Sequence, residues 1–219
     1  MNRVLITGSN GTIGRALAEK LGPSYDIIPY DLPEHDATNF RQLERCLKSS
    51  NALIHLAFDL RSENSQTGCA GNPENLLMGH VALAAAAKVG VETCIMGSSV
   101  HAARSTGHNN QSYRTTKLAL EAAATMQAER YPSTSFVSIR FGYVSPDDRS
   151  PEPPLRVNQT WLSHQDAAGL VRAVMDAPPD PTHQVVYGVS NRTDGLPYDT
   201  SNQYGWAPQD WFGQPAMEA

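Results

Sequence analysis

A tyrosine and a lysine four residues apart, Tyr113 and Lys117, are the residues of this chain best suited to acid–base chemistry. They fall in a segment that predicts a long helix, Gln111–Arg130, and residues at i and i+4 of a helix share a face. A nearby ammonium favours the phenolate and lowers the tyrosine pKa, which makes the phenol a usable proton acceptor near neutral pH. The alternative is an ordinary surface pair on a helix.

Two serines, Ser98 and Ser99, follow a short apolar run that predicts a strand over Thr93–Gly97. Open α/β sheets bind ligands at the carboxyl ends of their strands, so a hydroxyl at this position can hold a reacting oxygen beside Tyr113. We expect Ser99 to face the site, and the alternative is a serine pair in a turn.

A glycine-rich segment follows the first apolar run of the chain, Arg3–Thr7. Its Gly8-x-x-Gly11-x-x-Gly14 spacing predicts a tight turn, a close approach of the backbone to a diphosphate, and a helix packed closely on the sheet. The start of that helix presents free N–H groups and a partial positive charge to phosphates. The segment therefore indicates a dinucleotide site.

An acidic residue, Asp31, ends the second predicted strand, Tyr25–Tyr30. A carboxylate there accepts hydrogen bonds from the adenosine ribose hydroxyls and repels a 2′-phosphate, which favours NAD over NADP. Arg15 is the one nearby residue that would attract a 2′-phosphate. The alternative is a structural glycine turn with an unrelated acid.

Short apolar runs alternate with longer helical stretches along the chain, which predicts βαβ units and a parallel sheet. The path from Asp31 to Asp36 is too short for the strand that a doubly wound sheet usually has there, so we expect that edge strand to be missing. Residues Pro146–Pro154 are expected to form a loop, and Ser163 is expected to cap a helix that ends at Met175. The tail from Asn191 shows no clear hydrophobic periodicity. The remaining predicted elements are helices Thr12–Leu21, Asn39–Leu47 and Glu74–Val89, and strands Ala52–Leu56, Ser135–Arg140 and Gln184–Tyr187.

Composition excludes several classes of protein. The chain has 219 residues, 40% of them hydrophobic, and a net charge of -5, which argues against a nucleic-acid partner. No apolar run has the roughly 20 residues needed to span a membrane, and we expect no leader sequence before the first strand. Three scattered cysteines (Cys46, Cys69 and Cys94) have no metal-ligand spacing and fit a reducing compartment, so we expect a cytoplasmic protein without a metal site.

These motifs together resemble the extended short-chain dehydrogenase/reductase superfamily, also called the NAD-dependent epimerase/dehydratase family. The resembling segments are Thr7–Gly14, Asp31, Asp36-Ala37, His55-Leu56-Ala57, Gly97-Ser98-Ser99, Tyr113-x-x-x-Lys117 and Arg140-Phe141-Gly142. The resemblance implies a single NAD(P)-binding Rossmann domain over residues 1–219, a doubly wound α/β fold with a short C-terminal substrate-binding part, mainly residues 141–219.

The resemblance also implies roles for particular residues. Ser99, Tyr113 and Lys117 would be catalytic. The cofactor-binding residues would be Gly8, Asn10, Gly11, Thr12, Ile13, Gly14, Asp31, Leu32, Asp36, Ala37, Leu56, Ala57, Phe58, Tyr113 and Lys117.

Within this family, uronate dehydrogenases have stretches similar to residues 98–101, 140–142, 160–166, 185–191 and 205–208 of this chain. Those enzymes oxidise a hexuronic acid with NAD, and the likeness implies that Ser99, His101 and Arg140 bind the substrate, with Arg140 pairing with its carboxylate. Ordinary alternatives are a salt bridge at a strand end for Arg140 and a loop histidine for His101.

The chain departs from that pattern at four places. Val100 replaces an asparagine, Leu60 a serine, and Leu76 a helix asparagine that supports the catalytic lysine, with Asn75 one position away. The segment 105–110 is also shorter than its counterpart. The departures indicate an altered sugar-acid pocket around retained dehydrogenase residues.

The sequence is therefore interpreted as an NAD-dependent oxidoreductase that transfers hydride between NAD and a hydroxyl or carbonyl of a small polar substrate, including a sugar acid. Two alternatives stay open: an epimerase, dehydratase or reductase acting on a sugar or natural-product intermediate, and a dinucleotide-binding regulatory protein without turnover. The resemblance implies a homodimer interface on the Ala-rich stretches Val81–Lys88 and Leu118–Ala128, and the alternative is ordinary packing of these stretches against the sheet.

Overall fold

A six-stranded, all-parallel sheet forms the centre of the computed structural model, which describes residues 2–61, 71–103, 111–149, 160–191 and 198–212. The strand order is β2-β1-β3-β4-β5-β6. The strands are β1 (Arg3–Thr7), β2 (Asp26–Tyr30), β3 (Ala52–His55), β4 (Thr93–Ser99), β5 (Ser135–Phe141) and β6 (Gln184–Gly188). The predicted Rossmann-type α/β fold is confirmed.

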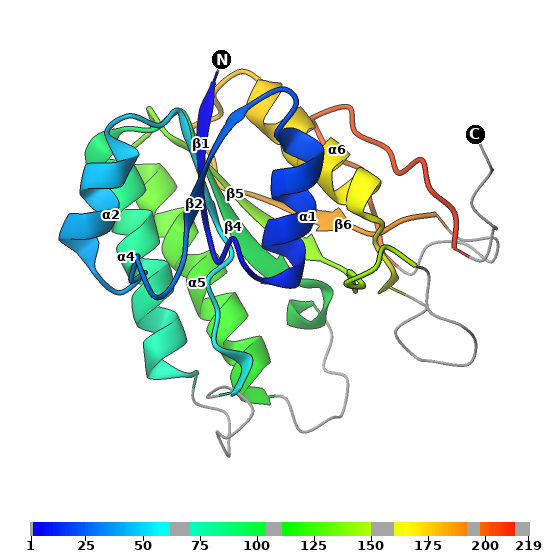
Figure 1. The fold of residues 1–219 in the computed structure, drawn as a ribbon, viewed down its shortest axis with the longest axis horizontal. Helices are drawn as coiled ribbons and strands as arrows, with labels where there is room; N and C mark the ends of the chain where they lie inside the picture. The colour runs from blue at the N-terminus through cyan, green and yellow to red at the C-terminus, as the bar shows by residue number, and fades with distance from the viewer. Residues whose placement is uncertain (1, 62–70, 104–110, 150–159, 192–197, 213–219) are drawn as a thin grey trace.

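Helices cover both faces of the sheet (Figure 1). Helices α2, α4 and α5 lie on one face, and α1 and α6 pack together on the other. The helices are α1 (Thr12–Leu21), α2 (Phe40–Leu47), α4 (Pro73–Val89), α5 (Gln111–Arg130) and α6 (His164–Asp176), with a short 3₁₀ helix η1 (Val100–Ala102). The side chain of Ser163 accepts a hydrogen bond from the Asp166 N–H, which confirms its predicted role as the N-cap of α6.

Because both faces are covered, successive residues of each inner strand are buried in different apolar clusters. Val4 and Ile6 of β1 pack with α1 and α6, whereas Leu5 between them packs with α2 and α4. Burial of both side-chain sets fixes the register, since a slip of one residue would exchange them.

Strand β2 is the edge of the sheet in the described part of the chain, so the predicted absence of a further strand there is confirmed. The connection after β2 turns instead around Asp36, whose side chain accepts hydrogen bonds from both the N–H and the hydroxyl of Thr38. Asn39 then caps α2.

Strands β4 and β5 extend further than the apolar runs indicated. β4 continues to Ser99 rather than ending at Gly97, and β5 continues to Phe141, because the two strands pair to their ends, Ser98 opposite Arg140 and Ser99 opposite Phe141. Other predicted element boundaries agree within one or two residues. Cys69, segment 105–110, and the part of the Pro146–Pro154 loop after residue 149 lie outside the described residues.

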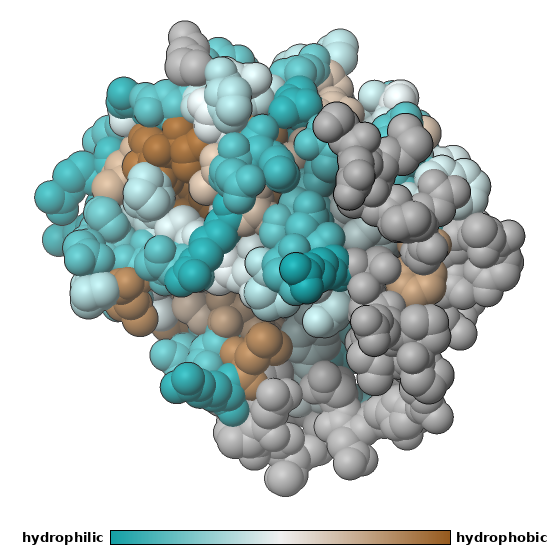
Figure 2. All heavy atoms as spheres, turned by 45° about the vertical axis from the view of Figure 1, so that its right-hand side comes forward, coloured by the Kyte–Doolittle hydropathy of each residue, from teal (hydrophilic) through white to brown (hydrophobic). Residues whose placement is uncertain are grey.

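The surface drawn in Figure 2 is mainly hydrophilic among its coloured atoms, with apolar side chains in small separate patches. Among the helices described, none combines the length and apolar character that crossing a membrane requires.

A buried side-chain pair joins the carboxyl ends of β1 and β3. Thr7 Oγ1 lies 2.8 Å from His55 Nδ1, and it also accepts hydrogen bonds from the N–H groups of Leu56 and Ala57. Since that oxygen accepts twice, its own proton is available to His55. Burial, followed by repulsion from Lys117, lowers the pKa of His55 to about 3.

The lowered pKa of His55 predicts acid sensitivity. Below pH 6.5 the unfolded chain protonates this histidine and the folded chain does not. The free energy of unfolding therefore decreases as the pH is lowered from about 6.5 to about 3. Between pH 7 and pH 5 the free energy of unfolding of the wild type should fall by about 2 kcal/mol more than that of His55→Asn. Urea denaturation at both pH values measures the difference.

The matched control is His80→Asn, which changes an exposed histidine on α4. It should keep the wild-type pH dependence, and equal dependence in all three proteins would contradict the assignment to His55.

Candidate active site

The strand order creates a switch point at the carboxyl edge of the sheet. The chain passes from β1 outward to β2 and then returns to the other side of β1 as β3. In open parallel sheets, this reversal is where ligands bind. The glycine-rich turn after β1 and residues 56–58 after β3 flank that point.

The glycine-rich turn has the geometry its spacing predicted. Gly8 has φ +70°, and a Cβ there would lie 2.6 Å from the Ala57 nitrogen. A side chain on Gly14 would overlap the Gly8 carbonyl and Ser9, so α1 approaches the turn more closely than any other residue type permits. Gly11 precedes α1 as its N-cap, without a side-chain cap.

This turn fits the diphosphate of a dinucleotide. Asn10, Gly11 and Thr12 are exposed, and no acidic side chain lies in the first turn of α1. Ser9 Oγ is buried and has no hydrogen-bond partner in the described structure. Uncapped N–H groups at a helix start attract phosphate oxygens. Thr12 and Ile13, also predicted to contact the cofactor, form the start of this helix.

Asp31 lies against the same turn. Its carboxylate accepts hydrogen bonds from the N–H groups of Asn10 (2.8 Å) and Leu32 (2.9 Å), which holds it at the end of β2 beside the turn. Asp36 and Leu32 are exposed and Ala37 is buried. Of the predicted adenosine-side residues, Asp31 is thus held directly against the glycine-rich turn.

Tyr113 and Lys117 lie on the same side of α5, as predicted, and face the loop after β3. Lys117 Nζ donates a hydrogen bond to the Gly97 carbonyl of β4 at 2.8 Å and lies 5.6 Å from the Tyr113 ring centroid. The Phe58 ring contacts both: its centroid is 3.9 Å from Lys117 Nζ and 5.3 Å from the Tyr113 ring. Lys117 is 8% exposed.

The two serines of β4 have different partners. Ser99 Oγ accepts the N–H of His101 at 3.2 Å and so caps η1, whereas Ser98 Oγ donates to Glu121 Oε1 at 2.6 Å on α5. His101 is exposed. Ser99 thus lies at the strand tip, and Ser98 is part of a buried polar network.

Arg140 lies at the centre of that network. Its Nε and Nη2 donate to the two Glu121 carboxylate oxygens at 2.9 and 2.7 Å, and its Nη1 donates to the Tyr187 hydroxyl at 2.7 Å. The hydrogen bonds that Arg140 donates to Glu121 raise the Arg140 pKa above its ordinary value. The structure thus contains the salt bridge that was the ordinary alternative for Arg140, with both side chains largely buried.

One contributor to the site, Glu121, was missed in the sequence, and another, Asn75, was noted only as lying next to Leu76. Glu121 follows Lys117 by four residues, so the helical spacing that singled out Tyr113 and Lys117 also places it on their side of α5. Asn75 is fully buried, and its side-chain amide accepts the Asp59 N–H at 2.7 Å and donates to the Asp59 carbonyl at 3.1 Å. It therefore holds the loop after β3, whereas sequence similarity directed attention to Leu76.

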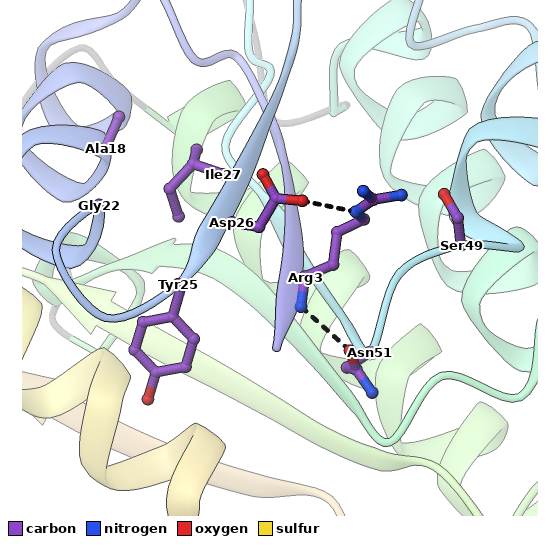
Figure 3. Close-up of a pocket in the computed structure, with 8 residues that line it drawn as sticks. All are labelled: Arg3, Ala18, Gly22, Tyr25, Asp26, Ile27, Ser49 and Asn51. Carbon is purple, nitrogen blue, oxygen red and sulfur yellow. Dashed lines mark hydrogen bonds and ion pairs between the residues drawn. The ribbon is translucent and has the colours of Figure 1, made fainter. Parts of the chain in front are cut away.

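A separate surface hollow of about 670 Å³ lies at the opposite, amino edge of the sheet. Figure 3 shows that Arg3 at the start of β1 contacts Asp26 and Asn51 there. These polar groups satisfy one another, and none of the residues predicted to act in catalysis lines the hollow.

The chain is similar to known proteins over most of its length. Residues 4–166 match the model of the NAD dependent epimerase/dehydratase family. A uronate dehydrogenase of Pseudomonas putida is 28% identical over 95% of this chain and 84% of the relative. An NAD-dependent glucose-6-phosphate dehydrogenase of Haloferax volcanii is 26% identical over 99% of this chain and 98% of the relative.

A solved structure titled as a mutated uronate dehydrogenase superposes with a TM-score of 0.76 and 24% identity, covering 96% of this chain and 82% of that one. This likeness supports the fold. The family match extends from β1 through the start of α6 and so includes the glycine-rich turn, Tyr113 and Lys117. The chain therefore belongs to the NAD dependent epimerase/dehydratase family, and its cofactor is NAD.

Proposed function

We propose that this protein is an NAD-dependent dehydrogenase that oxidises a hydroxyl group of a small polar sugar derivative, with sugar acids among the candidates. The observation that carries the proposal is the position of Tyr113 and Lys117 at the carboxyl edge. There residues 56–58 lie between them and the glycine-rich turn. The names of the relatives, uronate dehydrogenase and glucose-6-phosphate dehydrogenase, support this substrate class.

In this proposal the Tyr113 phenol takes the proton of the substrate hydroxyl. The Lys117 ammonium, fixed by the Gly97 carbonyl, favours the ionised phenol and would also hold the nicotinamide ribose of the cofactor. When bound, NAD accepts the hydride. The reverse reduction uses the same side chains.

Ser99, His101 and Arg140 are proposed to hold the substrate. Ser99 lies at the β4 tip and would fix the reacting oxygen, while the exposed His101 lies two residues further along the chain. Nη1 and Nη2 of Arg140 each carry two N–H groups and have one acceptor each among the described residues, which would leave one N–H on each nitrogen for an anionic or polar group. We further propose that residues 1–219 act as one domain, with substrate contacts mainly from 141–219.

An epimerase or dehydratase that returns the hydride would use the same cofactor site. Product analysis distinguishes the two: a dehydrogenase accumulates NADH in proportion to product, whereas a recycling enzyme does not.

We also propose a cytoplasmic homodimer that associates through α4 and α5. Both helices expose large apolar side chains, Leu77 at 50% and Met126 at 71%. A symmetric pair is the commonest soluble oligomer, and Cys46 and Cys94 are free thiols, as a reducing compartment favours.

Replacing the proposed proton acceptor tests the function. Tyr113→Phe should lower kcat by about 10²–10⁴-fold, because the phenol oxygen is lost, while NADH affinity changes little. NADH absorbance across a panel of sugar acids, sugars and sugar phosphates measures turnover, and fluorescence titration measures affinity. Tyr131→Phe, just beyond the far end of α5, should keep wild-type activity; full turnover by Tyr113→Phe on the true substrate would refute the mechanism.

The dimer predicts a defined change in mass. Light scattering after size-exclusion chromatography should give twice the mass of one chain for the wild type and the mass of one chain for Leu77→Glu or Met126→Glu, since a charge is costly to bury unpaired. Val185→Glu, at a comparably exposed apolar residue on β6, should remain dimeric. A monomeric wild type would rule the dimer out.

A further inference from the structure

The Phe58 ring lies where the lysine of the proposed active site would meet the cofactor. Its centroid is 3.9 Å from Lys117 Nζ, well within the roughly 6 Å range of a cation–π contact, and the ring packs edge-to-face with the Tyr113 ring. The ammonium also donates to the Gly97 carbonyl. The phenyl ring therefore lies directly against the ammonium that Lys117 would present to a ligand.

The backbone on both sides of Phe58 is fixed. Before it, the Leu56 N–H donates to the Thr7 carbonyl at 3.0 Å, and the Ala57 nitrogen lies against Gly8. After it, the Asn75 amide binds both the N–H and the carbonyl of Asp59. With the main chain held at 56 and 59, rotation of the Phe58 side chain is the local motion that uncovers the ammonium.

The N-terminus of α4 strengthens this hold. Asn72, 2% exposed, caps α4 by accepting the N–H groups of Glu74 and Asn75, and its own N–H donates to Thr116 Oγ1 on α5. Thr116 directly precedes Lys117. The loop that carries Phe58 and the helix that carries Lys117 are thus both hydrogen-bonded to the N-terminus of α4.

We propose that Phe58 sets the affinity for the nicotinamide half of the cofactor, because its ring covers the Lys117 ammonium and must rotate away before the nicotinamide ribose can bind there. This inference rests on the proposed function, which places that ribose at Lys117. Removing the ring removes the competing cation–π contact, so cofactor affinity should increase. The adenosine half, bound at the glycine-rich turn and Asp31, should be unaffected.

Calorimetric titration of NADH and of ADP, which lacks the nicotinamide riboside, separates the two halves. Phe58→Ala should bind NADH about five-fold more tightly than the wild type, which corresponds to ~1 kcal/mol, with ADP affinity unchanged within two-fold. Phe58→Leu keeps apolar volume without a π face and should also bind NADH more tightly than the wild type. This second variant keeps the test informative if the alanine variant does not fold.

Phe40→Leu is the matched control, since its ring lies 5.3 Å from Lys88 Nζ on α4, away from the site. It should leave both affinities unchanged. Unchanged or weaker NADH binding by the folded Phe58 variants, or equal changes for NADH and ADP, would overturn the role of Phe58. Failure of the wild type to bind either ligand would instead overturn the proposed function.

Discussion

The hydrogen bond from the Lys117 ammonium to the Gly97 carbonyl is the contact on which the arrangement of this site depends. A charge as buried as this one is costly unless it is paired or hydrogen-bonded. The bond meets part of that requirement and fixes α5 against the end of β4. One turn further along α5, Glu121 binds Ser98 of β4 and Arg140 of β5. Charged groups on one helix are thus tied to two adjacent strands.

The parallel sheet places this contact at the same edge as the glycine-rich turn. Because α5 returns antiparallel to the strands, its first turns lie over their carboxyl ends, which places Tyr113 and Lys117 at the same edge as the glycine-rich turn. Residues 56–58 span the distance between them, in contact with Gly8 on one side and with Lys117 on the other. The cofactor loop and the proton-transfer pair are therefore parts of one packed structure.

Sequence reasoning succeeded where the signal is local. Glycine spacing follows from steric limits within one turn, and the Tyr113–Lys117 relation follows from helical periodicity, so both were predictable together with the α/β fold. The Arg140 partner was not, because Glu121 reaches it only through the register of α5 against β5. For the same reason Asn75 could not be connected to Asp59, 16 residues away. The extension of β4 through Ser98 and Ser99 was not predictable either, because these polar residues are also typical of turns. They belong to the strand because they pair with β5, which is distant in the sequence.

A crystal structure of this protein in complex with NADH would test most directly whether Tyr113 and Lys117 act on a bound dinucleotide. We expect the diphosphate at Gly8–Gly14, the nicotinamide ribose on the Lys117 ammonium and the nicotinamide ring beside the Tyr113 hydroxyl. A dinucleotide bound away from the carboxyl edge of the sheet, or a Tyr113 side chain directed away from the nicotinamide, would contradict the proposed mechanism.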